Sequence, residues 1–196
     1  ALNSFEAFGN VRMEQGDTLF IYGDYLYYDG QTQLAQLRDN VRLINRQTEL
    51  ATDSLNYDRI ENLGYYFEGG TLTDAENVLT SYWGEYSPET KMAVFNENVT
   101  LENPKFVLTS DTLEYSTETR IASIVGPSDI NNEETHIFSR LGFYNTATEQ
   151  GELLDRSVIH YQTRELTGDS LYYDRITGIG EAFGDIIMND TVNKNM

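Results

Sequence analysis

The stretch Gly23–Asp29 reads GDYLYYD, and it returns almost unchanged as GDSLYYD at Gly168–Asp174. The two copies differ at one position, where Tyr25 in the first corresponds to Ser170 in the second. They are 145 residues apart, which is five times 29. A phrase that returns at a multiple of a fixed interval indicates an internal repeat, so the intervening chain is expected to follow the same interval.

Six tyrosines follow one another at intervals of 29 residues, with no insertion between them. They are Tyr28, Tyr57, Tyr86, Tyr115, Tyr144 and Tyr173. The residue seven positions after each tyrosine is small, namely Ala35, Gly64, Ala93, Ala122, Gly151 and Gly180. Asp, Ser or Asn follows each tyrosine directly. The sequence therefore predicts six units of 29 residues each.

Each unit is predicted to hold two long strands joined by tight turns. After the turn that begins at Asp29-Gly30, a typical hairpin signal, apolar residues alternate with polar ones. A period of two is typical of a half-buried strand, and short turns favour antiparallel pairing of about 13 strands. The residues predicted to point into one shared interior are Ala35, Leu37, Val41 and Leu43, and in the third unit Ala93, Phe95, Val99 and Leu101.

Strands with one apolar face must be enclosed by two facing sheets or by one sheet folded over, which predicts an all-β domain. The Gly and Ala residues at the seventh place are predicted to form a row that lets the facing sheet approach or leaves room inside. The segment Pro127–His136 is predicted to be the one clear polar loop.

Composition excludes several classes of function. The 196 residues carry a net charge of −19, which argues against nucleic acid as a partner. The chain has no cysteine, so disulfides, thiol nucleophiles and cysteine metal sites are excluded. It has no apolar run of the length that spans a membrane, so no transmembrane segment is expected. Because it starts at Ala1, we expect a removed leader or a longer parent protein, with residues 1–196 forming a single domain.

No catalytic constellation is predicted. Four acids share one phase of the repeat, which favours strand-edge or turn chemistry over a catalytic pair; they are Asp24, Asp53, Asp111 and Asp169. His136 and His160 fall at different phases, and neither is accompanied by a matching serine or carboxylate motif. We therefore expect no enzyme activity, no bound metal and no cofactor.

The two ends of the chain share a phrase, EAFGNVRM at Glu6–Met13 and EAFGDIIM at Glu181–Met188. The array thus begins and ends at nearly the same phase, as expected for a segment of a longer array. Edge strands with unpaired backbone groups invite strand addition. The predicted association edges are Val11 and Met13 at one end and Ile186 and Met188 at the other, pairing head to tail with another copy or a partner module.

The repeat resembles the OstA-like family, which includes periplasmic LptA, LptC and the N-terminal domain of LptD, and most of all its Bacteroidetes-type members. The residues that carry the resemblance are TDSLNYD at Thr52–Asp58, SDTLEYS at Ser110–Ser116, RDNVRL at Arg38–Leu43 and NENVTL at Asn96–Leu101. The resemblance covers essentially the whole chain. It implies an open β-jelly roll, made by folding over one antiparallel sheet, and transport of lipopolysaccharide in the periplasm toward the outer membrane. Other Lpt modules are the implied protein partners.

The resemblance also implies that the interior shields the acyl chains of lipid A. Each buried CH₂ group contributes about 0.8 kcal/mol, so an apolar interior can hold such a lipid without catalysis. The implied lipid-binding residues are Leu26, Tyr28, Leu37, Val41, Leu55, Tyr57, Phe95, Val99, Leu101, Leu113, Tyr115 and Ile124. The charge of −19 repels anionic head groups, which are expected to stay outside or to be bridged by divalent cations.

Two other functions stay open on the residues alone. One is a surface or adhesin-type β-repeat module whose core is filled by side chains. The other is a parallel β-helix enzyme acting on polysaccharide, against which the hairpin turns argue. The tyrosine row is compatible with core packing or with stacking on a ligand. Alternation of apolar residues does not distinguish a filled interior from an open groove.

Overall fold

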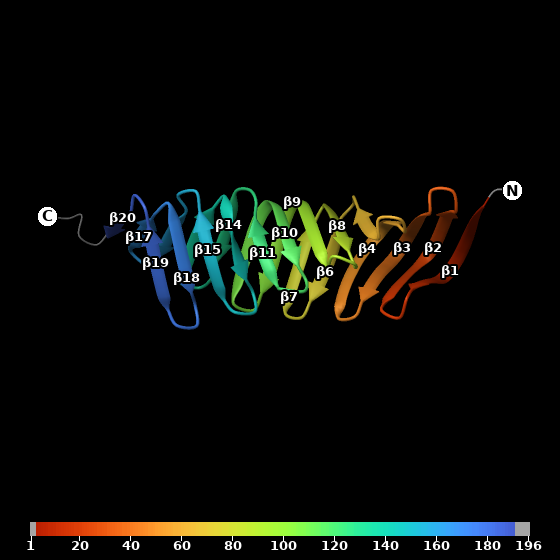
Figure 1. Cartoon of the computed structure of the whole chain (residues 1–196), viewed down its shortest axis with the longest axis horizontal. Coiled ribbons are helices and arrows are strands. Elements are labelled where there is room, and N and C mark those ends of the chain that lie inside the picture. Colours follow the sequence, from red (N-terminus) through yellow and green to blue (C-terminus); the bar gives the residue numbers. More distant parts are fainter. Residues whose placement is uncertain (1–2, 191–196) are drawn as a thin grey trace.

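The structure, a computed structural model, describes residues 3–190, which form an elongated molecule made only of strands and their turns (Figure 1). The strands cross the long axis, and the chain advances along that axis from one end of the molecule to the other. Residues 3–190 contain no helix that is long and apolar enough to cross a membrane.

The first part of the chain forms ten strands: β1 (Ser4–Gln15), β2 (Leu19–Asp29), β3 (Leu34–Asn45), β4 (Thr48–Asp58), β5 (Leu63–Tyr66), β6 (Gly70–Asp74), β7 (Asn77–Ser81), β8 (Trp83–Ser87), β9 (Met92–Asn103) and β10 (Phe106–Ser116). The second part forms ten more: β11 (Ile121–Ile124), β12 (Ser128–Asn131), β13 (Thr135–Ser139), β14 (Leu141–Asn145), β15 (Gln150–Leu154), β16 (Val158–Tyr161), β17 (Arg164–Thr167), β18 (Ser170–Asp174), β19 (Ile179–Phe183) and β20 (Ile187–Asp190).

These elements amount to thirteen long strands in the described residues, as the repeat predicts. Strands β1 to β4, β9 and β10 run unbroken over 11 or 12 residues. The other fourteen are short and form seven consecutive pairs, such as β5 with β6, each pair being one long strand interrupted near its middle. All of the strand pairings are antiparallel, which excludes the parallel β-helix.

Strand β4 shows how one sheet becomes two layers. Its first half, Thr48–Thr52, pairs with β6, whereas its second half, Asn56–Asp58, pairs with β5. Strand β10 divides in the same way between β12 and β11. The sheet is therefore folded over along a line through the middle of its strands. We call the half that carries the six tyrosines the tyrosine layer, the other half the facing layer, and the fold between them the corner.

Residues with positive φ form the corner. In β3 they are Asp39 and Asn40, with φ of 60° and 52°, and in β9 they are Glu97 and Asn98, with φ of 64° and 56°. Each pair coincides with a shift in register between neighbouring strands. Asn and Asp adopt the left-handed conformation more readily than other residues with a side chain. This explains why Asn precedes Val in the repeated phrases, because such a bulge bends the strand at that point.

The acids that share one phase lie at this corner, where two of them, Asp24 and Asp53, accept hydrogen bonds from Asn40. Asn40 Nδ2 donates a 2.6 Å hydrogen bond to Asp24 Oδ2, and the Asn40 amide donates one of 3.4 Å to Asp53 Oδ1. Asp111 lies at the register shift between β9 and β10. The predicted structural role of these carboxylates agrees with these contacts.

The predicted interior is confirmed. Each of its eight residues is at most 1% exposed: Ala35, Leu37, Val41, Leu43, Ala93, Phe95, Val99 and Leu101. The first four lie on β3 and the others on β9, and residues on both sides of the corner face the same core. The register that the alternation predicts is therefore correct.

The small residues make room for the tyrosine rings. Tyr57 pairs across the strands with Ala35 on one side and with Gly64 on the other. The same alternation of tyrosine and small residue runs from β2 to β19, whereas at the N-terminal edge Tyr28 pairs with Phe5 of β1. A Cβ atom on Gly151 would lie 2.9 Å from the Tyr144 ring, which is too close. The space expected beside the small residues is therefore occupied by the aromatic side chains.

The turns of the tyrosine layer use the predicted side-chain chemistry. Asp58 Oδ1 accepts hydrogen bonds from the amides of Ile60 and Glu61 at 2.8 and 3.1 Å. The equivalent Asn145 and Asp174 accept bonds from the amides two and three positions later in the same way. A short side chain that caps its own turn explains why Asp, Ser or Asn follows each tyrosine.

The prediction of a polar loop at Pro127–His136 is wrong, because β12 and β13 occupy most of that segment. Ile130 is its inward apolar residue, with 7% exposure. The neighbouring inward position is Ser128, whose hydroxyl donates to Ser110 Oγ at 2.8 Å. A serine whose hydroxyl bonds to a second buried serine can lie in the core. In the sequence such a serine looks like a loop residue, because its side chain is polar.

Candidate functional site

The twelve residues predicted to contact lipid all line the interior between the two layers. Eleven are buried, and Tyr28 is half-buried at the N-terminal end. The buried ones are Leu26, Leu37, Val41, Leu55, Tyr57, Phe95, Val99, Leu101, Leu113, Tyr115 and Ile124. In the structure they pack against one another, so the interior at these positions is filled by the chain's own side chains.

The two layers also meet on the side opposite to the corner, and we call this contact the seam. Asn45 Nδ2, at the end of β3, donates to Tyr86 Oη at 3.0 Å. One repeat further along, Tyr115 Oη donates to Asp74 Oδ2 at 2.8 Å. Asn45 and Asp74 are 29 residues apart, as are Tyr86 and Tyr115, so the seam contact repeats with the sequence.

Asn77 extends the seam toward the C-terminus. It is 2% exposed, and its Nδ2 donates to Tyr115 Oη and to Thr146 Oγ1, both at 2.9 Å. Its Oδ1 accepts a 2.9 Å hydrogen bond from Asn103 Nδ2. Buried amides with several partners fix the relative position of the two layers, because leaving one of them unpaired is costly.

Burial raises the pKa of three buried tyrosines of the tyrosine layer. The pKa of Tyr57 and that of Tyr144 rise to about 12 for this reason. The pKa of Tyr115 is raised as well, chiefly by burial and then by the charge of Asp74. The hydroxyls are therefore protonated at neutral pH and act as uncharged hydrogen-bonding groups.

The interior is less completely filled toward the C-terminus. A hollow there has a cavity volume of about 30 Å³, which is room for about one water molecule. The apolar side chains that line it come from both layers and are Phe106, Ile130, Ile137, Tyr144, Leu153 and Tyr173. We call it the C-terminal hollow. The ring of Phe106 meets that of Tyr144 edge-on, with centroids 5.0 Å apart.

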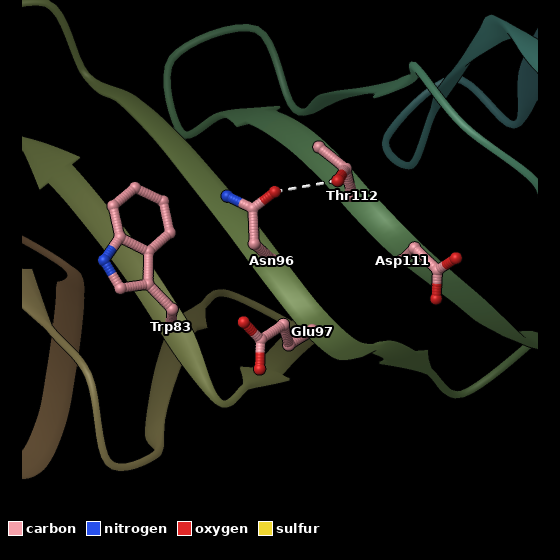
Figure 2. A pocket seen from close by; sticks show the side chains of 5 residues that line it. All are labelled: Trp83, Asn96, Glu97, Asp111 and Thr112. Carbon is pink, nitrogen blue, oxygen red and sulfur yellow. Dashed lines mark hydrogen bonds between the residues drawn. The ribbon is translucent and has the colours of Figure 1, made fainter.

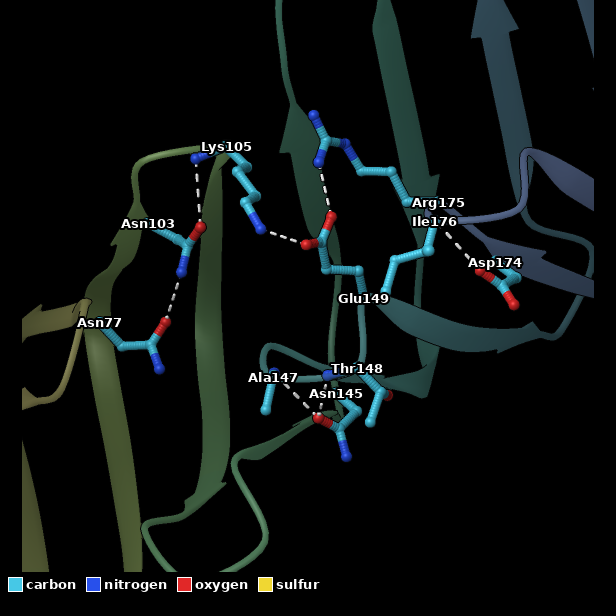
Figure 3. A network of polar contacts seen from close by, with 10 residues as sticks. All are labelled: Asn77, Asn103, Lys105, Asn145, Ala147, Thr148, Glu149, Asp174, Arg175 and Ile176. Atoms are coloured by element: carbon cyan, nitrogen blue, oxygen red, sulfur yellow. Dashed lines mark hydrogen bonds and ion pairs between the residues drawn. The ribbon is translucent and has the colours of Figure 1, made fainter.

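Two cations line the same hollow, and one carboxylate beside it pairs with both of them (Figure 3). Lys105 lies in the turn between β9 and β10, Glu149 precedes β15, and Arg175 follows β18. Lys105 Nζ pairs with Glu149 Oε1, and Arg175 Nη1 donates to Glu149 Oε2 at 2.5 Å. These hydrogen bonds, that of Lys105 first, lower the pKa of Glu149. Sequence reasoning missed this cluster, whose members come from three different turns.

A second hollow lies on the outside of the sheet near the corner (Figure 2). It is lined by Trp83, Asn96, Glu97, Asp111 and Thr112. Thr112 Oγ1 donates to Asn96 Oδ1 at 2.7 Å, which ties β10 to β9.

The two histidines, which fall at different phases of the repeat, are direct partners across β13 and β16. Their rings stack with centroids 5.7 Å apart, and His136 Nε2 lies 2.6 Å from Asp129 Oδ1. Their positions on either side of the β14–β15 hairpin were the available signal. Across residues 3–190 no group of three or more His, Cys, Asp or Glu side chains could hold a metal ion.

Comparison with known proteins identifies the family. The model of the OstA-like protein family matches residues 1–111, more than half of the chain. The chain belongs to the OstA-like family. None of the curated proteins compared with this OstA-like chain matches it.

A solved structure similar to the OstA-like chain is that of LptH, the LptA-homologous periplasmic component of the lipopolysaccharide transport device of Pseudomonas aeruginosa. The two share 16% sequence identity with a TM-score of 0.54, over 58% of this chain and 93% of LptH. At this identity the similarity concerns the fold, and it confirms the predicted β-jelly roll.

Proposed function

We propose that this OstA-like chain is a non-enzymatic module of lipopolysaccharide transport, which shields the acyl chains of lipid A between its two layers. The proposal rests on the apolar interior, which is continuous between the two layers. Buried apolar side chains from both layers form one cluster that extends from Val11 in β1 to Leu171 in β18. Membership of the family and the similarity to LptH support the same function and a periplasmic location.

Side chains fill the middle of the interior. An acyl chain can therefore enter it only when the two layers separate. The seam contacts described above all involve a side chain, so opening the seam leaves the backbone pairing of each layer intact. A net hydrogen bond contributes about 1 kcal/mol, and each buried CH₂ group contributes about 0.8 kcal/mol. A few methylene groups of one acyl chain therefore offset the loss of one seam contact.

The ends of the array suit assembly with further modules. Strand β1 pairs only with β2, and at the other end β19 and β20 each pair with one strand among the described residues. Val11 is 9% exposed, whereas Ile186 and Met188 are 54% and 62% exposed. We infer that Val11 and Met13, and Ile186 and Met188, form association edges that pair head to tail with another OstA-like module. Such pairing would continue the interior into a bridge across the periplasm.

A reversible cross-link across the seam tests the proposal. Asn77 and Thr146 are in contact across it, and the chain has no natural cysteine, so the double variant Asn77→Cys/Thr146→Cys can be closed by oxidation and reopened by reduction. A photoreactive residue at Val99 or Leu113 reports lipid in the interior, and one at Thr100 or Glu114 reports the outer face. We expect lipopolysaccharide cross-links from Val99 and Leu113 in the reduced form and their loss in the oxidised form.

The same experiment decides against the proposal if lipid cross-links from the outward positions alone, or equally from all four positions in both forms. That result favours the other candidate, a surface or adhesin-type module with a permanently filled core. The oxidised and reduced samples are the same protein, so each controls for the folding of the other.

A further inference from the structure

The mouth of the C-terminal hollow combines an apolar lining with positive charge in a strongly acidic chain. The whole chain carries 13 Lys and Arg against 32 Asp and Glu. At this mouth two cations, Lys105 and Arg175, share one carboxylate, Glu149, so that the cluster has one excess positive charge. Another hollow at the seam also contains cations, Arg46, Lys91 and Arg120, but polar side chains line most of it.

The two cations have unused hydrogen-bonding capacity. An ammonium group offers three donors and a guanidinium group five, and the bonds described here use one from each side chain. The side chains of Lys105 and Arg175 are 42% and 39% exposed, so the remaining donors are accessible from solvent. The side chain of Glu149 is 10% exposed, and its carboxylate lies between them (Figure 3).

The acid that precedes Arg175 in sequence is occupied in its own turn. Asp174 precedes Arg175, and its Oδ1 accepts hydrogen bonds from the amides of Ile176 and Thr177, both at 3.0 Å. Its Oδ2 accepts one from Gln150 Nε2 at 3.0 Å. Figure 3 shows this carboxylate on the far side of Arg175 from Glu149. The excess positive charge at the mouth is therefore not directly neutralised by Asp174.

We propose that this mouth binds the phosphate head of an acylated lipid, while one of its acyl chains enters the C-terminal hollow as the two layers part and widen it. The inference rests on the proposed function and names the place where a phosphorylated lipid docks on this acidic chain. Arg pairs with phosphate through two parallel hydrogen bonds, and Lys adds a point charge. The apolar lining of Phe106, Ile130 and Ile137 supplies the burial that an acyl chain requires.

Glu149 has a defined place in this site. It occupies one donor of each cation and competes with the phosphate for both. A purely structural cluster would be weakened by loss of any of its three members. A phosphate site, in contrast, loses affinity when a cation is removed and gains affinity when the competing carboxylate is neutralised.

Titration of the 196-residue chain with dodecyl phosphate, below its micelle concentration, tests the site by methyl NMR. Ile130 and Ile137 report on the hollow, whereas Ile21 and Ile124 report on the filled interior. We expect shifts at Ile130 and Ile137 with dodecyl phosphate, and much weaker binding of dodecyl maltoside, which has the same chain and a neutral head. Inorganic phosphate alone, without a chain, is expected to bind at least tenfold more weakly.

Three variants give the decisive comparison. Lys105→Gln and Arg175→Gln should each weaken binding of dodecyl phosphate about tenfold, since hydrogen bonds to charged groups are the stronger class. Glu149→Gln should tighten it severalfold. The matched control is Lys91→Gln, at the polar seam hollow, which should leave the affinity unchanged. Thermal unfolding of each variant verifies that the fold is retained.

The inference is overturned if dodecyl phosphate and dodecyl maltoside bind equally, if the two cation variants bind as well as the parent, or if Glu149→Gln weakens binding. Shifts confined to Ile21 and Ile124 would also overturn it. None of these results affects the interior cross-links at Val99 and Leu113, which test the proposed function separately.

Discussion

The hydroxyl of Tyr115 donates a 2.8 Å hydrogen bond to the carboxylate of Asp74, and both residues are buried. Tyr115 lies in the tyrosine layer and Asp74 at the end of β6 in the facing layer, so the bond crosses the seam. No backbone ladder joins these two residues, because β6 pairs with β4 and β7, whereas this half of β10 pairs with β9 and β11. Side-chain contacts of this kind hold the seam closed over the apolar interior.

Removal of the Tyr115 hydroxyl is the most direct test of the seam. Tyr115→Phe keeps the ring but leaves Asp74 and Asn77 without one partner each. We expect a loss of about 1.5 to 3 kcal/mol in the free energy of unfolding, measured with urea. The matched control is Tyr28→Phe, whose hydroxyl accepts an exposed hydrogen bond from Arg59, with an expected change within about 0.5 kcal/mol. Equal effects of both variants would contradict a special role of the seam bond.

A second prediction concerns the alternation of tyrosine and small residues. Ala93 pairs with Tyr86 on one side and with Tyr115 on the other, and it is fully buried. Ala93→Leu should therefore destabilise the fold by about 1 to 3 kcal/mol, because the added atoms overlap the flanking rings. Val94→Leu, at the adjacent outward position, is the control and should be nearly neutral. An unchanged midpoint of urea unfolding for Ala93→Leu would show that the rings have room to move.

Much of this fold follows from the sequence because the repeat exposes it. Tyr57 and its five equivalents define the interval, and the alternation from Ala35 to Leu43 defines which face is inside. Single substitutions within one repeat are harder to interpret. Gly84 replaces a leucine of the repeat, and the ring of Tyr66 fills the space, with its hydroxyl 2.7 Å from that of Ser81. That compensation involves another strand and leaves no periodic signal.

The candidate site was less predictable than the fold. Alternation shows which side chains face inward, but the gap between two layers depends on how the rings and small residues fit together. The cluster of Lys105, Glu149 and Arg175 depends on turns that are distant in sequence. One signal was available: Glu149 is acidic at a turn position where the two preceding repeats have Lys91 and Arg120, all three with positive φ.

The same cluster predicts a dependence of stability on pH. The pKa of Glu149 is lowered in the folded protein, by hydrogen bonds from Lys105 and then Arg175. Its contribution to stability is therefore present above the unfolded pKa of about 4.3 and is lost as the pH falls through the lower folded value. Glu149→Gln should reduce the free energy of unfolding by about 1 kcal/mol at pH 7, since solvent screens the partly exposed cations.

This difference between parent and variant should vanish near the acid limit, where the parent carboxyl is protonated as well. Urea unfolding at a series of pH values measures both proteins under identical conditions. A difference that stays constant across the series would show that packing of Glu149, and not its charge, is responsible. Arg42→Gln, which removes an exposed ion pair with Glu49, serves as a comparison.

The last prediction concerns the association edges. Strand β20 pairs through Ile187 with Thr167 of β17, and several apolar side chains at this end are about half exposed, including Phe183 and Met188. Long bare edges are rare in proteins, and strand addition satisfies their backbone groups while covering the apolar side chains. We expect the chain to self-associate with increasing concentration in sedimentation experiments.

Ile187→Pro should reduce that association, because proline removes an amide donor and disturbs the edge strand. Ile187→Thr keeps the amide and a strand-forming side chain and should associate more strongly than the proline variant; equal association of the two would contradict pairing through this strand. Methyl signals of Ile21 and Ile124 report whether the remaining repeats stay folded, which separates loss of the edge from loss of the structure.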